Sequence, residues 1–104
     1  MHPGKREERR NAIEASQRAV ADRFGVSVET LCRERGRTVS LPRQIAMYLA
    51  KELTEASLPE IGASFGGKHH TTVMHAIAKI HHQRLTDAAL DRVVSGLSSR
   101  LSQR

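Results

Sequence analysis

A chain of 104 residues is about the size of one domain and can bury a modest hydrophobic core. Its 17 Lys and Arg outnumber its 11 Asp and Glu, and the formal net charge of +6 favours a polyanionic partner, either nucleic acid or an anionic membrane surface. Two Phe, one Tyr and no Trp argue against proteins that bind single strands by stacking bases on aromatic side chains. The single cysteine excludes an internal disulfide. No apolar run reaches the ~18–20 residues of a membrane span, and the charged N-terminus lacks a secretory signal. We therefore expect a cytoplasmic protein.

The pattern of apolar residues predicts an all-α fold of about six helices. Helical periodicity recurs along the chain, whereas the period-two alternation of strands is not sustained. The charged residues 1–10 predict a solvated, frayed start, so residues 1–16 are expected to be a linker or a frayed helix start. Residues 17–104 are expected to form the folded domain.

The first half of the chain predicts three helices. A helix is expected over residues 11–24, which are rich in alanine, and Gly25 ends it. Ser27 is a good N-cap for a short second helix. Residues 33–38 follow as a basic loop. Leu41-Pro42 then opens the most strongly patterned helix, whose apolar residues are expected on one face: Ile45, Ala46, Leu49, Ala50 and Leu53.

The second half predicts a helix-turn-helix followed by a last helix. Ser57-Leu58-Pro59-Glu60 matches a capping box, in which Ser57 and Glu60 each accept a hydrogen bond from the other's amide. The short helix that follows ends at Gly66-Gly67, and a longer helix is expected over residues 70–83. The last helix begins after Thr86 and is expected to turn four residues inward: Leu90, Val94, Leu97 and Leu101.

The longer helix of this motif has a face rich in hydrogen-bond donors. Its inward residues are expected to be Val73, Ala76, Ile77 and Ile80. The opposite face has no acidic residue and presents Thr71, Thr72, His75, Lys79 and His82. Recognition helices meet base edges near their N-terminal end, which here is occupied by residues 70–72. A solvated face of an ordinary amphipathic helix has the same pattern, so the helix alone leaves both interpretations open.

The basic loop is the second candidate element. It carries Arg33, Arg35 and Arg37, and Arg43 follows in the next helix. Arginines without neighbouring aromatics suit phosphate contacts or insertion into a narrow minor groove, although a solubilising surface loop has the same composition. Together with the helix-turn-helix, the loop favours a double-stranded DNA partner and no small-molecule substrate.

Two further patterns suggest other chemistry. Five of the six histidines lie between residues 69 and 82, but none forms the spacing with Glu of a metalloprotease helix, so we expect no metal and no cofactor. Residues 62–68 fit the spacing of a phosphate-binding loop, yet His69 replaces the required Ser or Thr and no strand precedes it. Cys32 has no catalytic partner motif and is expected to be buried. We therefore expect no enzyme activity; a metal-dependent enzyme would instead retain zinc through dialysis.

Three segments carry a family resemblance. They are PRQIAMYLAKELT at residues 42–54, SLPEIG at residues 57–62 and FGGKHHTTVMHAIAKI at residues 65–80. In order and spacing they resemble the C-terminal DNA-binding domain of DnaA, the family of bacterial chromosomal replication initiators, over about residues 17–101. The resemblance implies a Trp-repressor-like helical domain that binds nine-base-pair DnaA boxes at replication origins and some promoters, with its recognition helix in the major groove.

The resemblance also implies roles for individual residues. Residues 70–72 would read bases or their flanking phosphates, with His75 and Lys79 in support, and Arg35 would enter the minor groove. Three residues would hold the phosphate backbone: Arg43, Gln44 and Lys51. The complete predicted DNA-binding set is Arg33, Arg35, Arg37, Arg43, Gln44, Lys51, Leu58, Pro59, Lys68, His69, His70, Thr71, Thr72, His75 and Lys79.

One position departs from the family pattern. The family usually has Asp where this chain has His69, and an Asp there caps the recognition helix and can accept a hydrogen bond from a cytosine amino group. We expect His69 to be a poorer cap, at a cost of ~1 kcal/mol. It could instead donate to phosphate or to guanine.

The resemblance finally implies partners beyond the domain. Proteins of this family carry an ATPase module upstream, and a linker helix that contacts acidic phospholipids. Residues 5–24 form a basic, mildly amphipathic stretch suited to such a contact, although a linker helix that packs on the domain fits this stretch better. The location would be the nucleoid. A stand-alone transcriptional regulator or adaptor is the alternative. Gene sequence upstream of Met1 would discriminate an initiator from a stand-alone protein.

Overall fold

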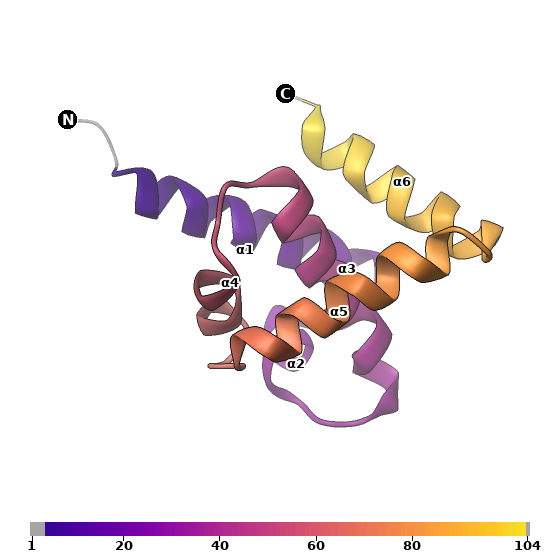
Figure 1. Cartoon of the computed structure of the whole chain (residues 1–104), viewed down its shortest axis with the longest axis horizontal. Helices are drawn as coiled ribbons and strands as arrows, with labels where there is room; N and C mark the ends of the chain where they lie inside the picture. Colours follow the sequence, from indigo (N-terminus) through magenta and orange to yellow (C-terminus); the bar gives the residue numbers. More distant parts are fainter. Residues whose placement is uncertain (1–3, 104) are drawn as a thin grey trace.

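The computed structural model describes residues 4–103, which form six helices and contain no strand (Figure 1). The helices are α1 (Lys5–Phe24), α2 (Val28–Arg33), α3 (Arg37–Leu53), α4 (Leu58–Ser64), α5 (His70–Arg84) and α6 (Ala88–Ser102). The predicted all-α fold with a helix-turn-helix is confirmed, and α4 and α5 form that motif.

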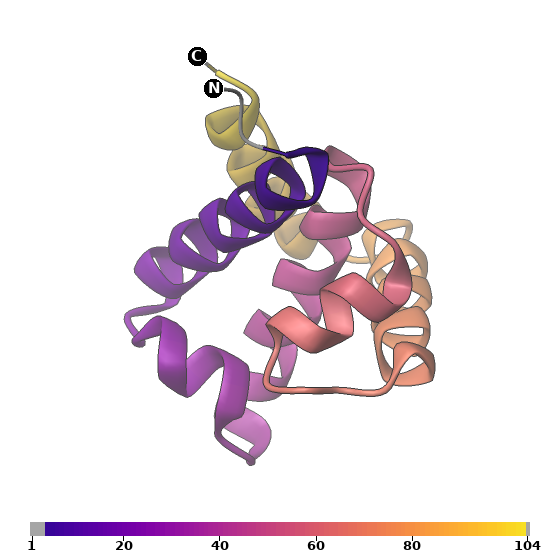
Figure 2. The ribbon, with the colours of Figure 1, turned by 90° about the vertical axis from the view of Figure 1, so that its left-hand side faces the viewer.

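Helix α3 is the centre of the domain and contacts each of the other five helices. Figure 2 shows it between α1 and the pair formed by α4 and α5. Residues 45–50 are all buried, because the surrounding helices cover α3 on more than one side. The expectation of a single inward face was therefore too narrow, since Met47 and Tyr48 are buried as well.

Helix α1 begins earlier than the sequence predicts. It starts at Lys5, so the expected frayed start is wrong for residues 5–10. A long-range contact helps to order this part, because the Arg9 guanidinium pairs with the Glu60 carboxylate on α4 at 2.9 Å. Residues 1–3 lie outside the described part of the chain. Helix α1 runs without a break across residues 16 and 17, and the domain boundary expected there stays a prediction.

Helix α3 also begins early, at Arg37 rather than at Leu41-Pro42. Pro42 lies inside the helix, where its missing amide leaves the Thr38 carbonyl without a helical partner. Burial of Val39 and Pro42 against the rest of the domain offsets this loss. The predicted basic loop is consequently shorter, with only residues 34–36 between the two helices.

The helix-turn-helix depends on local hydrogen bonds and on glycine. Both hydrogen bonds of the capping box predicted at Ser57 and Glu60 are present. Gly66 and Gly67 have φ of 76° and 78°, a region that favours glycine. Gly62 meets the backbone of the turn so closely that a Cβ there would lie 2.1 Å from the Lys68 carbonyl oxygen. Glycine at 62 therefore lets the turn fold back onto α4.

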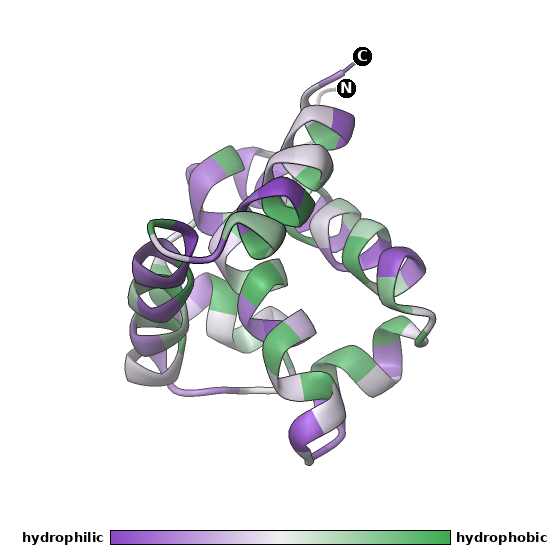
Figure 3. Cartoon of the chain, turned by 90° about the vertical axis from the view of Figure 1, so that its right-hand side faces the viewer, coloured by the Kyte–Doolittle hydropathy of each residue, from purple (hydrophilic) through white to green (hydrophobic). Residues whose placement is uncertain are grey.

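The remaining helices bury the residues that their spacing predicts. In α5, Val73, Ala76 and Ile80 are buried, and Ile77 is half-buried against the core. Hydrophobic positions, green in Figure 3, recur along the helices and alternate with hydrophilic ones. None of the helices within residues 4–103 combines the length and the apolar character needed to cross a bilayer.

Candidate nucleic-acid interface

The outward face of α5 offers hydrogen-bond donors and no carboxylate, because α5 contains neither Asp nor Glu. Its exposed polar residues include His70, Thr72, His75, Lys79 and His82, and His81 is exposed in the last turn, whereas Thr71 is half-buried. Met74 is a large apolar side chain that is also exposed on this helix. A face of this composition can donate hydrogen bonds to acceptors and attract an anion.

A hollow lies between this face and α3. Six of the predicted site residues line it together, namely Arg43, Gln44, Lys68, Thr72, His75 and Lys79. Ser40, Met47 and Ala76 complete the lining. Sequence reasoning missed Ser40 and Met47, although their spacing of four and three residues from Gln44 places all three on one side of α3. The amide oxygen of Gln44 is buried without a hydrogen-bond partner in the described part of the chain.

His69 occupies the N-cap of α5. Its Nδ1 accepts a hydrogen bond from the Thr71 amide at 3.2 Å and lies 2.8 Å from the Thr71 hydroxyl oxygen. The His69 ring also lies against the His70 ring, with 4.3 Å between the centroids. His69 thus caps the helix, and the expectation that it does so less well than Asp stays a prediction.

The basic segment, residues 33–37, joins α2 to α3 beside the helix-turn-helix. Arg33 is the last residue of α2 and Arg37 the first of α3. These two arginines and Arg35 are exposed. Gly36 has a φ of 128°, in the region that favours glycine, and it turns the chain into α3. Three cations are therefore presented on a short, tightly turned segment.

Two predicted DNA contacts, Arg43 and Lys68, also fasten the basic segment to its neighbours. Arg43 donates from Nε to the Leu31 carbonyl at 2.7 Å and from Nη2 to the Glu34 carbonyl. Lys68 donates from Nζ to the Cys32 carbonyl at 3.1 Å and to the Phe65 carbonyl at 3.0 Å. These carbonyls lie at the C-terminal ends of α2 and α4, where helical partners are missing. The sequence contained no local signal for this role.

Positive charge accumulates around these contacts. Burial lowers the pKa of the Lys68 ammonium below its ordinary value, and the neighbouring Arg43 guanidinium lowers it further. Burial also raises the pKa of the Cys32 thiol, because the effect of burial is larger than the opposite effect of the Arg43 charge. Cys32 is buried, as predicted, and remains uncharged at neutral pH. An anion near Arg43 and Lys68 would relieve the repulsion between them.

Three predicted residues lie apart from the hollow, the basic segment and the start of α5. Lys51, near the end of α3, is exposed and donates from Nζ to the Ala56 carbonyl at 3.2 Å. Leu58 and Pro59 form the first turn of α4, where Leu58 is half-buried against the core and Pro59 is exposed. The structure does not place them with the residues of the hollow.

The geometry also places the histidine-rich stretch and the segment with the spacing of a phosphate-binding loop. Across residues 4–103, no three His, Cys, Asp or Glu side chains gather where they could hold a metal ion. The segment that resembles a phosphate-binding loop begins inside α4, and its Lys68 donates to backbone carbonyls. No strand precedes it in the described chain, so it lacks the structural context of such a loop.

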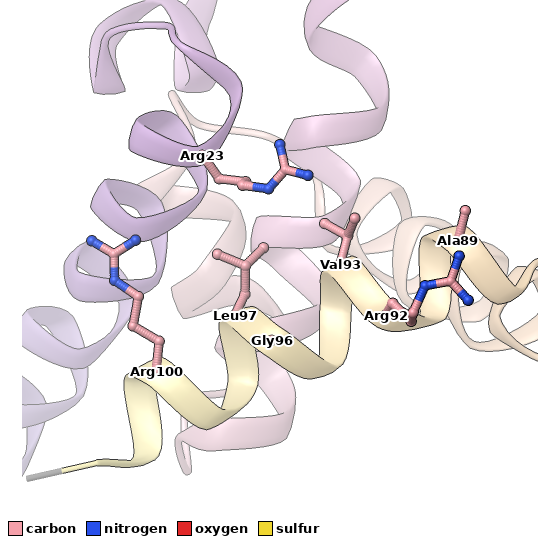
Figure 4. Close-up of a pocket in the computed structure, with 7 residues that line it drawn as sticks. All are labelled: Arg23, Ala89, Arg92, Val93, Gly96, Leu97 and Arg100. Atoms are coloured by element: carbon pink, nitrogen blue, oxygen red, sulfur yellow. The ribbon is translucent and has the colours of Figure 1, made fainter.

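A second surface lies between α1 and α6 and contains none of the predicted site residues. Figure 4 shows Arg23 on α1, and Arg92 and Arg100 on α6, around an apolar floor that includes Val93 and Leu97. The acidic phospholipid contact expected of residues 5–24 concerns α1 and stays a prediction.

Comparison with known proteins identifies the family. Residues 13–80 match the model of the bacterial dnaA protein helix-turn-helix family. The chain is 47% identical over 94 residues to a chromosomal replication initiator protein DnaA from Burkholderia multivorans, covering 89% of this chain and 18% of that protein. It is 51% identical over 92 residues to the DnaA protein of Lactobacillus delbrueckii subsp. bulgaricus, covering 88% of this chain and 20% of that protein. The chain thus spans about a fifth of the length of these curated relatives.

Solved structures share the fold. The crystal structure of a DNA replication initiation factor matches with a TM-score of 0.80 and 31% identity, covering 91% of this chain and 29% of that chain. A replication initiator DnaA bound to AMPPCP and single-stranded DNA matches with a TM-score of 0.78 and 31% identity, covering 90% of this chain and 28% of that chain. The family match includes the hollow, the basic segment and the first eleven residues of α5, and the chain belongs to the bacterial DnaA helix-turn-helix family.

Proposed function

We propose that this domain binds double-stranded DNA sequence-specifically at sites like DnaA boxes, as the DNA-binding domain of a replication initiator. One observation carries the proposal: the carboxylate-free donor face of α5 shares a hollow with Arg43 and Lys68, which also hold the basic segment. In this arrangement α5 enters the major groove, and Arg35 reaches the adjacent minor groove. The proposal assigns the domain no catalytic step.

The composition of the face suits the major groove of a duplex. Helix α5 has 15 residues and is ~22 Å long at 1.5 Å per residue, which is ample for its first turns to enter a groove ~12 Å wide. Base edges there present several acceptors, and phosphates on both sides present more. Hydroxyl, imidazole and ammonium donors match these acceptors, whereas a carboxylate would repel the phosphates.

Duplex DNA is favoured over single strands. A single-strand site would need aromatic side chains at the surface on which bases stack. Here Tyr48 and Phe65 are buried in the core, and Phe24 is half-buried at the end of α1. The relative solved with single-stranded DNA is about three and a half times as long as the part of it that this chain matches, so the match does not assign that ligand to this domain.

A binding selection on randomised duplexes tests the proposal. We expect one enriched motif that is similar to a DnaA box. If about six phosphates are neutralised, the affinity for this motif should fall with salt with a log–log slope near −5. Equal affinity for the motif and a scrambled duplex, or tighter binding to the single strand, would overturn the proposal.

The wider role is proposed on the same basis. The relatives are named as chromosomal replication initiators, and this chain spans about a fifth of each. We propose that it acts together with an ATPase module of the same gene product, at an origin in the cytoplasmic nucleoid. We expect the full gene product to bind origin DNA, and a variant of it with a disabled basic segment not to bind.

A further inference from the structure

The imidazole of His69 is held in a defined orientation at the start of α5. Its Nδ1 accepts from the Thr71 amide at 3.2 Å, and the Thr71 hydroxyl oxygen lies 2.8 Å away. On its other side, the ring lies against His70 with 4.3 Å between the centroids. The residue is nonetheless exposed. The ring is thus fixed by its neighbours while one edge remains accessible.

This hydrogen bond determines where the ring carries its proton. A backbone amide can only donate, so Nδ1 must be the unprotonated nitrogen of the neutral ring. The proton therefore resides on Nε2. Nε2 lies on the side of the ring away from the cap and makes no hydrogen bond to another part of the described chain. It is a donor, and it cannot serve as an acceptor.

We propose that His69 is a specificity residue that selects guanine at one position of the bound site. The proposal rests on the proposed function, which places the start of α5 in the major groove. Guanine presents two acceptors and no donor there, whereas adenine pairs one acceptor with an amino donor, thymine pairs one acceptor with a methyl group, and cytosine presents an amino donor. A ring locked with its donor outward should favour guanine and disfavour cytosine on the strand that it faces.

The residues around the cap allow the base contact to be separated from capping. Asp is a favoured N-cap and its outward oxygen is an acceptor, so His69→Asp should invert the preference toward cytosine. Ser is also a favoured N-cap but is too short to reach a base edge, so His69→Ser should leave that position without preference. His81→Asp makes the same change of side chain in the last turn of α5 and serves as the control.

The experiment is a parallel selection on randomised duplexes with the unaltered chain and these three variants. The unaltered chain and His81→Asp should recover one motif with guanine at one position. His69→Asp should recover the same motif with cytosine there, and His69→Ser should recover it with that position degenerate. The unaltered chain should bind the duplex with guanine at this position about five- to tenfold more tightly than the duplex with cytosine there. His69→Asp should show the opposite preference, of similar size.

Two outcomes would overturn the inference in distinguishable ways. If every variant recovers the same motif and His69 variants bind all duplexes equally more weakly, His69 contacts phosphate or only caps α5, while the proposed function stands. If the unaltered chain recovers no motif, the proposed function itself fails and the inference fails with it. Thermal unfolding by circular dichroism identifies variants that do not fold; should His69→Asp be one, guanine preference retained by His69→Ser would still overturn the inference.

Discussion

Lys68 donates a hydrogen bond from Nζ to the backbone carbonyl of Cys32 at 3.1 Å, although 36 residues separate them in the sequence. The same ammonium also donates to the Phe65 carbonyl at 3.0 Å. One side chain thereby connects the end of α2, which leads into the basic segment, to the turn of the helix-turn-helix. The two elements proposed to contact adjacent grooves are thus held in a defined relative position.

Lys68→Met should destabilise the domain and weaken DNA binding. Removal of the ammonium leaves two partly buried carbonyls without their partner, so the free energy of unfolding should fall by ~1–2 kcal/mol. Lys51→Met is the matched control, because exposed Lys51 also donates to a carbonyl and its loss should cost less than ~0.5 kcal/mol. Urea unfolding measures both values, and equal losses would show that Lys68 has no special structural role.

Gly62→Ala should destabilise the helix-turn-helix strongly. A Cβ at this position would lie 2.1 Å from the Lys68 carbonyl oxygen, and backbone on both sides must move to relieve the contact. We expect a loss of roughly 3 kcal/mol or more. Gly96→Ala, also within a helix, meets nothing within 4 Å and should stabilise the domain by ~0.5–1 kcal/mol. Thermal unfolding of the two variants should therefore shift in opposite directions.

The pair formed by Arg9 and Glu60 should make stability depend on acid pH. Hydrogen bonds from the Arg9 guanidinium, and next from the Ser57 amide, lower the pKa of Glu60 from its ordinary value of 4.5 to about 2. Because the folded-state pKa is the lower one, this stabilisation is complete above pH 4.5 and is lost as the pH falls towards 2.

Glu60→Gln provides the comparison for this pH effect. Its melting temperature should be lower than that of the unaltered chain at pH 7, and the two values should converge between pH 4.5 and 2. Parallel melting curves over this range would contradict the prediction. Arg9→Gln should behave in the same way, because it removes the other partner of the pair.

Thr72→Val should relax sequence preference without changing the fold. Thr72 is exposed in the hollow, and its hydroxyl makes no hydrogen bond within residues 4–103, whereas the Thr71 hydroxyl oxygen lies 2.8 Å from His69 Nδ1. Valine keeps the shape and loses the hydroxyl, so we expect about fivefold weaker binding to the preferred duplex and little change for others. Lys51→Met should instead weaken all duplexes alike and reduce the salt slope by about 1. Fluorescence anisotropy at several salt concentrations measures both effects.

The sequence by itself determined the helices and most of their ends. Ser27, Ser57 and Asp87 cap helices through hydrogen bonds to amides three residues away, and such contacts depend on residues that are close in the chain. The inward residues of α5 and α6 follow from helical spacing for the same reason. The sequence also predicted the donor-rich face of α5, because the residues that share one side of a helix follow from their spacing in the chain.

Only the tertiary structure decided how these helices share their contacts. Three features depend on which distant elements pack together. Helix α3 is covered on several sides, and Arg9 helps to order the start of α1. Arg84 joins α3 and α6 through hydrogen bonds to Tyr48 and Asp91. The same holds for Lys68, whose charge predicted a DNA contact but whose carbonyl partners come from α2 and the turn. A side chain's long-range partners are set by the packing of whole helices, and no local pattern of residues encodes them.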